Sequence, residues 1–107
     1  MAIGYLGKTK LAANMNTAVY SVPAGKFTTA NVAMCNIGDA SAKIRLAIVD
    51  GAAADLADED YIEYGTSIPA GGIFERSALT LSAGETVVVW SDKGSVSVRV
   101  HGYEEVV

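Results

Sequence analysis

The chain has 107 residues, half of them hydrophobic and 19% charged, with a formal net charge of −4. This length and composition predict one folded domain spanning residues 1–107 rather than a disordered tail. Its eight Lys and Arg residues are scattered singly, which argues against a nucleic-acid partner, and its single cysteine allows no internal disulfide. No apolar run approaches the length of a membrane span, so we expect neither membrane insertion nor a signal peptide.

Alternation of apolar and polar residues predicts short β-strands at roughly ten-residue spacing along the chain. In order, the predicted strands are residues 3–11 (the weakest case), 16–22, 27–36, 42–50, 60–68, 73–81, 86–92 and 95–103. The last is the clearest, because Val96, Val98 and Val100 alternate with polar residues. Residues 86–92 are apolar on both faces, which is typical of a central strand or of one whose outer face meets a partner.

Three similar corners separate predicted strands. They read SVPAGKFT from Ser21, SIPAGGIF from Ser67 and LSAGETVV from Leu81. Each has an Ala-Gly pair, and two add a proline, so each favours a turn with a fixed or positive φ. Residues 51–60 are rich in alanine and acidic, and we expect them to form an exposed loop. The pattern predicts an all-β fold: a single antiparallel β-sandwich of about seven or eight strands, jelly-roll-like or immunoglobulin-like.

The residues that could carry chemistry are few. His101 has no recognisable nucleophile or orienting acid in sequence, so we interpret it as a surface or interface histidine. Cys35 lies in an apolar run and is interpreted as a small core residue. The acidic cluster lacks the spacing of an EF-hand loop and is interpreted as a solvated surface; it comprises Asp55, Asp58, Glu59 and Asp60. We therefore expect no catalytic residue, no bound metal and no enzymatic activity.

The sequence gives little support for two further classes of ligand, phosphates and sugars. The glycines do not form a phosphate-binding motif, because Gly71 and Gly72 precede a strand rather than a helix. Four aromatic residues could make a sugar platform, but residues spread over separate strands more often serve the core or an interface; they are Tyr61, Tyr64, Trp90 and Tyr103. We expect no cofactor.

Several segments together resemble the small β-sandwich virion proteins of tailed bacteriophages. They read VYSVPAGK, CNIGD, IEYGTSIPAGGIFER and GETVVVWSDKGSVSVRVHGYEE, and the likeness covers nearly the whole chain. The resemblance implies a structural component of the particle, above all a capsid decoration or cement protein that stabilises the shell. It also implies the major capsid protein as partner, a homotrimer, and a place on the virion surface after synthesis in the host bacterial cytoplasm.

Contact residues for such a role can be suggested from the mixed apolar and basic N-terminal stretch and from the strand that is apolar on both faces. Residues 1–10 are interpreted as an extended N-terminal arm or, equally, as a simple edge strand. The suggested capsid contacts in this stretch are Ile3, Tyr5, Leu6, Lys8 and Lys10. The suggested self-association residues are Ile73, Phe74, Val88 and Trp90. The alternative function is a tail or fibre component that binds a receptor or glycan through Tyr61, Tyr64 and the acidic loop.

Overall fold

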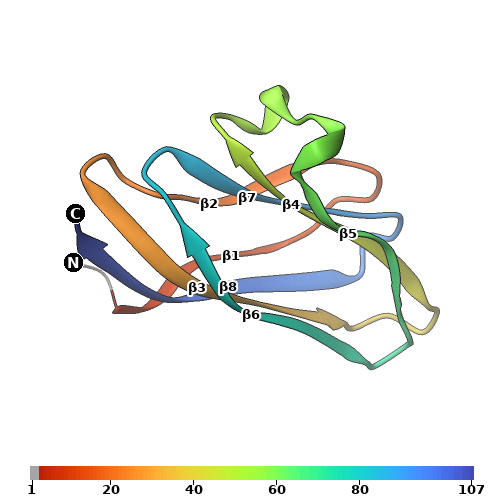
Figure 1. Cartoon of the computed structure of the whole chain (residues 1–107). Coiled ribbons are helices and arrows are strands. Elements are labelled where there is room, and N and C mark those ends of the chain that lie inside the picture. The colour runs from red at the N-terminus through yellow and green to blue at the C-terminus, as the bar shows by residue number, and fades with distance from the viewer. Residues whose placement is uncertain (1–2) are drawn as a thin grey trace.

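The computed structural model describes residues 3–107, which form two packed four-stranded antiparallel sheets (Figure 1). Sheet A has the order β1 (Ile3–Lys10), β8 (Val96–Val106), β3 (Lys26–Asn36) and β6 (Ile73–Leu81). Sheet B has the order β2 (Thr17–Ser21), β7 (Glu85–Ser91), β4 (Ala42–Asp50) and β5 (Tyr61–Ile68). The predicted all-β sandwich is confirmed. The weakest of the eight predicted strands, at residues 3–11, is present as β1.

The strand order is that of a jelly roll. Strand β1 pairs with β8, β2 with β7, β3 with β6 and β4 with β5, as in one long hairpin that has been rolled into two sheets. Two further pairings, β3 with β8 and β4 with β7, complete the sheets. This topology decides between the two predicted architectures in favour of the eight-stranded jelly roll.

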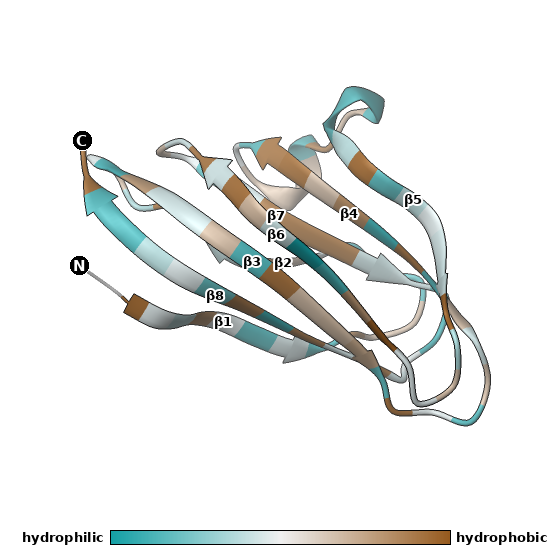
Figure 2. Ribbon diagram, turned by 60° about the horizontal axis from the view of Figure 1, so that its bottom comes forward, coloured by the Kyte–Doolittle hydropathy of each residue, from teal (hydrophilic) through white to brown (hydrophobic). Residues whose placement is uncertain are grey.

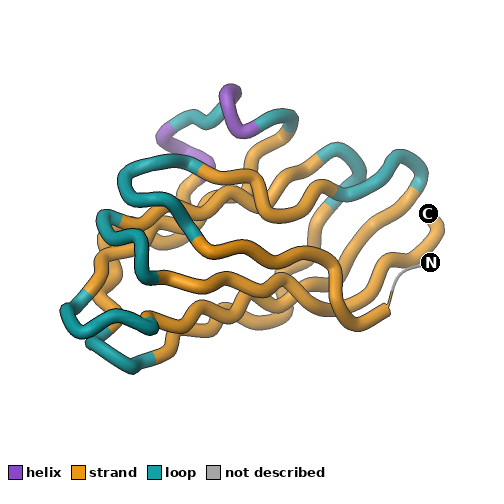
Figure 3. The backbone as a smooth tube through the Cα atoms, turned by 180° about the vertical axis from the view of Figure 1, so that it is seen from behind, coloured by secondary structure: helices purple, strands orange, loops and turns teal. Residues whose placement is uncertain are grey.

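Each of the three Ala-Gly corners carries the chain from one sheet to the other. Gly25 lies between β2 and β3, Gly71 between β5 and β6, and Gly84 between β6 and β7. Their φ angles are +76°, +71° and +87°, where glycine is favoured. Each corner is closed by a backbone hydrogen bond of 2.8 to 3.3 Å from the residue after the glycine to the carbonyl three positions earlier. The recurring Ala-Gly corner is therefore a turn at which the chain passes from one sheet to the other. Figure 3 shows the connections gathered at the two ends of the sandwich.

The core lies between the sheets and is built by period-two alternation. On β3, Ala30, Val32 and Met34 are at most 1% exposed, and Val96, Val98 and Val100 on β8 are at most 2% exposed. Sheet B contributes Ile44 and Leu46 from β4, together with inward residues of β7. Figure 2 shows apolar residues along β4 and β7, whereas β5 is mostly polar.

Strand β7 is apolar on both faces, and part of its outer face is covered by another segment of the same chain. Residues 51–60 form two short 3-10 helices, η1 (Ala53–Asp55) and η2 (Asp58–Asp60), which project beyond sheet B (Figure 1). Below them, Val88 is 2% exposed and packs with Val49 against Leu56. The expectation that Val88 contributes to self-association is therefore wrong, since its outer face is already filled. The segment is also more than a solvated loop, because Leu56 anchors it.

A buried asparagine joins three connections at one end of the sandwich. Asn36 has no exposed surface, and its Nδ2 donates hydrogen bonds of 2.7 Å to the Ala40 carbonyl and 3.0 Å to the Ile68 carbonyl. Its Oδ1 accepts bonds from the Gly38 N–H at 3.1 Å and the Ser95 hydroxyl at 2.9 Å. One amide therefore links the β3–β4, β5–β6 and β7–β8 connections.

A second buried polar group lies at the opposite end of β3. The Tyr20 hydroxyl donates a 2.6 Å hydrogen bond to Glu104 Oε2 and lies 2.8 Å from Thr28 Oγ1. Lys26 Nζ approaches the other Glu104 oxygen at 3.7 Å. Burial, and then the bond to Glu104, raise the pKa of Tyr20 to about 12. Three strands from both sheets thus meet at one carboxylate, which supports the packing of the sheets rather than forming an open site.

Candidate functional site

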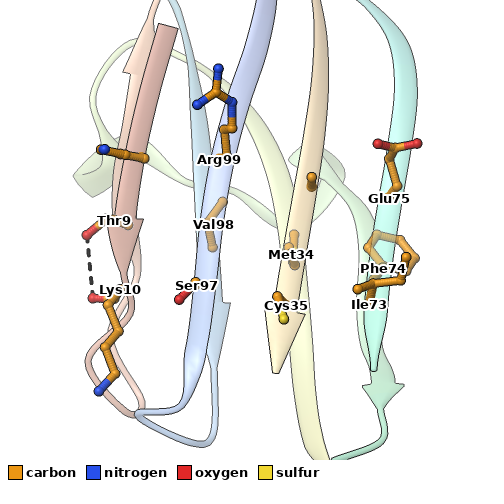
Figure 4. A pocket seen from close by; sticks show the side chains of 12 residues that line it. Thr9, Lys10, Met34, Cys35, Ile73, Phe74, Glu75, Ser97, Val98 and Arg99 are labelled. Atoms are coloured by element: carbon orange, nitrogen blue, oxygen red, sulfur yellow. Dashed lines mark hydrogen bonds between the residues drawn. The ribbon is translucent and has the colours of Figure 1, made fainter. Parts of the chain in front are cut away.

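The outer face of sheet A has a shallow trough, which we define by two rows of outward side chains. Strand pairing places Lys10, Ser97, Cys35 and Ile73 side by side in one row, and Lys8, Arg99, Ala33 and Glu75 in the next. Side chains on the central strand β3 are small, whereas those on the edge strands β1 and β6 are long. This size difference produces an open hollow of about 590 Å³ (Figure 4).

One side of the trough is positively charged although the chain as a whole is acidic. Lys8, Lys10 and Arg99 are exposed on β1 and β8, and none of the three is in an ion pair within residues 3–107. Lys8 Nζ lies 5.7 Å from the centroid of the Tyr5 ring, and Arg99 Cζ lies 5.6 Å from the same centroid. Contacts with one ring hold the two cations near each other at the surface.

The other end of the same face carries exposed apolar side chains. Ile3 on β1 is directly opposite Tyr103 on β8, and the two are 76% and 44% exposed. Tyr5, 53% exposed, is one alternation step along β1. We call Ile3, Tyr5 and Tyr103 the apolar patch. Sheet A thus presents an apolar patch and a basic-rimmed trough on one continuous outer face.

The N-terminal segment belongs to this face as an edge strand and not as a free arm. Residues 3–10 pair with β8 along their whole length, with a β-bulge between Tyr5 and Gly7. Gly7 is buried where β1 approaches the backbone of β2. Ile3, Tyr5, Lys8 and Lys10 lie on the exposed face, whereas Leu6 is partly buried and packs against the core, away from the other four suggested contacts. Residues 1 and 2, which belong to the predicted arm, lie outside the described residues.

The four residues suggested for self-association do not form one surface. Ile73 and Phe74 are on β6 of sheet A, whereas Val88 and Trp90 are on β7 of sheet B. Ile73 is 76% exposed beside the trough, but Phe74 points the other way and packs against the core. Because adjacent residues of a strand face opposite sides, Ile73 and Phe74 cannot serve the same contact.

The outer face of sheet B carries a row of stacked side chains. They come from three different strands, so the sequence pattern of a single strand does not show that they are in contact. Arg45 Cζ lies 3.9 Å from the Trp90 ring centroid and 4.3 Å from that of Tyr64. Tyr64 in turn meets Tyr61 edge to face, with ring centroids 4.9 Å apart. Tyr61, Tyr64 and Asp58 line a second hollow of about 310 Å³. Of the four aromatic residues considered for a sugar platform, Tyr61, Tyr64 and Trp90 therefore lie together, while Tyr103 is on the other sheet.

The remaining candidates for chemistry are separated in space. His101 lies on the outer face of sheet A, as expected for its strand position, whereas Cys35 is on the floor of the trough and not in the core. Asp55 Oδ2 and Asp60 Oδ2 accept backbone hydrogen bonds from Ala52 and Ala57. Across residues 3–107, no three His, Cys, Asp or Glu side chains gather as metal ligands would. Nor does this part of the chain contain a helix long and apolar enough to cross a membrane.

Comparison with known proteins gives similarity to solved structures but not to a family model or a curated sequence. No protein-family model matches the chain, and no curated protein matches it either. Among solved structures, the crystal structure of a pentameric capsid protein isolated from metagenomic phage sequences is similar, with a TM-score of 0.47 and 14% sequence identity. The alignment covers 92% of this chain, which spans 64% of the length of that protein.

Proposed function

We propose that the chain is a non-enzymatic structural protein of a phage virion, specifically a capsid decoration or cement protein. In this role it binds the major capsid protein on the outer surface of the shell and stabilises the particle through contact area. It is made in the host bacterial cytoplasm, carries no cofactor and assembles as a homotrimer.

The observation that carries this proposal is the outer face of sheet A. The apolar patch at one end of this four-stranded face offers an exposed contact surface, which suits binding to a broad protein partner. The resemblance of the sequence to small virion sandwiches supports the same role. Eight-stranded jelly rolls also occur in viral capsid proteins, although a shared fold supports a function only by analogy.

We assign the shell contact to the apolar patch, because desolvation of Ile3, Tyr5 and Tyr103 contributes binding free energy. The test is cosedimentation of the purified protein with capsids assembled from the major capsid protein of the phage that encodes it. The double variant Ile3→Ser/Tyr103→Ser should bind at least about tenfold more weakly than the wild type. Tyr64→Ser, which removes an exposed ring from sheet B (63% exposed, against 44% for Tyr103), is the control and should bind normally.

Two results would contradict this assignment in different ways. Normal binding by the double variant would place the shell contact elsewhere on the molecule. A wild-type protein that binds no capsid would refute the decoration role itself. Circular dichroism of each variant establishes that a loss of binding does not come from unfolding.

A second candidate function is supported by the aromatic residues of sheet B. Sugar rings stack on aromatic faces, and carboxylates accept hydrogen bonds from sugar hydroxyls. The hollow between Tyr61, Tyr64 and Asp58 has both features, so we also propose a glycan-binding tail or fibre module as the alternative. Binding of cell-surface glycans that is saturable in the wild type and lost in Tyr64→Ser would favour this function. Glycan binding that is unchanged by Tyr64→Ser would exclude the hollow as the glycan-binding site.

A further inference from the structure

The acidic excursion, which we define as residues 52–60, has surface properties opposite to those of the trough. It contains four carboxylates, those of Asp55, Asp58, Glu59 and Asp60, and no Lys or Arg. Its exposed apolar residues are alanines, namely Ala52, Ala54 and Ala57. Alanine methyl groups match a shallow trough floored by small side chains. The carboxylates match the cations on its β1 and β8 side, whereas Glu75 is on the opposite side, on β6.

The excursion is also held in shape. Asp55 and Asp60 each accept a hydrogen bond from the backbone N–H three residues earlier, at 3.0 and 2.8 Å, and Leu56 anchors the segment against sheet B. A segment already ordered in the free protein loses little conformational entropy when it binds. The excursion is therefore a preformed knob that projects from the molecule (Figure 1).

The two complementary surfaces lie on opposite sides of the sandwich. The trough is on the outer face of sheet A, while the excursion follows β4 and stands beyond sheet B. A chain cannot bring its own excursion into its own trough, but a second copy can supply one. We propose that the trough binds the acidic excursion of a second copy of this chain.

The contact is heterologous, because each copy offers a trough to one neighbour and an excursion to another. Such contacts close into a ring when the rotation between copies permits, and otherwise continue as an open chain. In this arrangement Lys8, Lys10 and Arg99 face Asp55, Asp58 and Glu59 of the neighbour. The inference goes beyond the proposed function and does not depend on it, since self-association is measured in solution without a capsid.

The test is sedimentation velocity over a wide range of protein concentration, at low and at high salt. The wild type should associate, and high salt should weaken the association because the opposing charges are at the surface. Lys8→Glu/Lys10→Glu should weaken association at least about tenfold, and Asp58→Lys/Glu59→Lys should do the same from the other side. Lys43→Glu/Lys93→Glu makes the same charge change as the first variant, away from the trough, and should associate like the wild type.

Mixing the two variants of the contact gives the decisive observation. Each mixed pair again places opposite charges across the contact, so the mixture should associate more strongly than either variant does alone. A wild type that stays monomeric at every concentration and salt would overturn the proposal. So would equal association in the two Lys→Glu double variants, or a mixture that stays monomeric. Salt-dependent binding of a DNA oligonucleotide by a monomeric wild type would assign the basic rim to nucleic acid instead.

Discussion

Replacement of Asn36 by leucine tests whether one buried amide fastens three connections of the sandwich. Leucine has nearly the same size, so the substitution leaves little cavity but removes every side-chain hydrogen bond. The four shorter bonds, of 2.7 to 3.1 Å, each contribute about 1 kcal/mol net. The expected loss is therefore about 4 kcal/mol, out of the roughly 5–15 kcal/mol that stabilises a domain of this kind.

Guanidinium chloride unfolding measures this loss, with the fluorescence of Trp90, the single tryptophan, as the probe. The midpoint should fall while the dependence on denaturant stays the same. Asn31→Leu is the matched control, because Asn31 makes one exposed hydrogen bond, from the Ala78 N–H at 2.9 Å. Its cost should stay below about 1 kcal/mol. An Asn36→Leu variant as stable as Asn31→Leu would refute the assignment of a joining role to Asn36.

Three further predictions concern the two sheets and their contacts. The raised pKa of Tyr20 means that its stabilising contribution is complete below pH 10 and is lost as the pH rises towards about 12, so the wild type should lose about 2–3 kcal/mol relative to Tyr20→Phe across that window. A constant difference in unfolding free energy would contradict this. Gly7→Ala places a methyl group against a backbone oxygen of β2 and should destabilise the protein by more than about 2 kcal/mol, whereas Gly94→Ala, whose added Cβ meets nothing closer than 3.9 Å, should cost less than about 1. Arg45→Met should change the emission of Trp90 and cost about 1 kcal/mol in thermal unfolding; an unchanged spectrum would argue against the stacked arrangement.

The strands could be predicted because their information is local. Alternation such as that of Val96, Val98 and Val100 places each residue on one of two faces, and the Ala-Gly corners mark where the chain changes sheet. The error at Cys35 shows the limit of judging a residue by the apolar character of its neighbours. Its neighbour Met34 is buried, so alternation turns Cys35 outward.

The binding surfaces depend on information that is not local. The trough exists because pairing brings Lys10, Ser97, Cys35 and Ile73 into one row, and these residues are far apart in the sequence. The run around Val88 left two explanations open, a central strand or a partner-facing one. Only the packing of Leu56 over Val88 shows that the covering group comes from the same chain. Side-chain size across paired strands, and not hydrophobicity along one strand, defines the candidate site.

The most direct test of the proposed virion role is the copy number of this chain in purified particles of the phage that encodes it. Quantitative mass spectrometry gives the ratio of this chain to the major capsid protein, and cryo-electron microscopy locates it. The decoration role predicts many copies at regular positions on the outer shell. Absence from the particle, or a few copies confined to the tail, would contradict it.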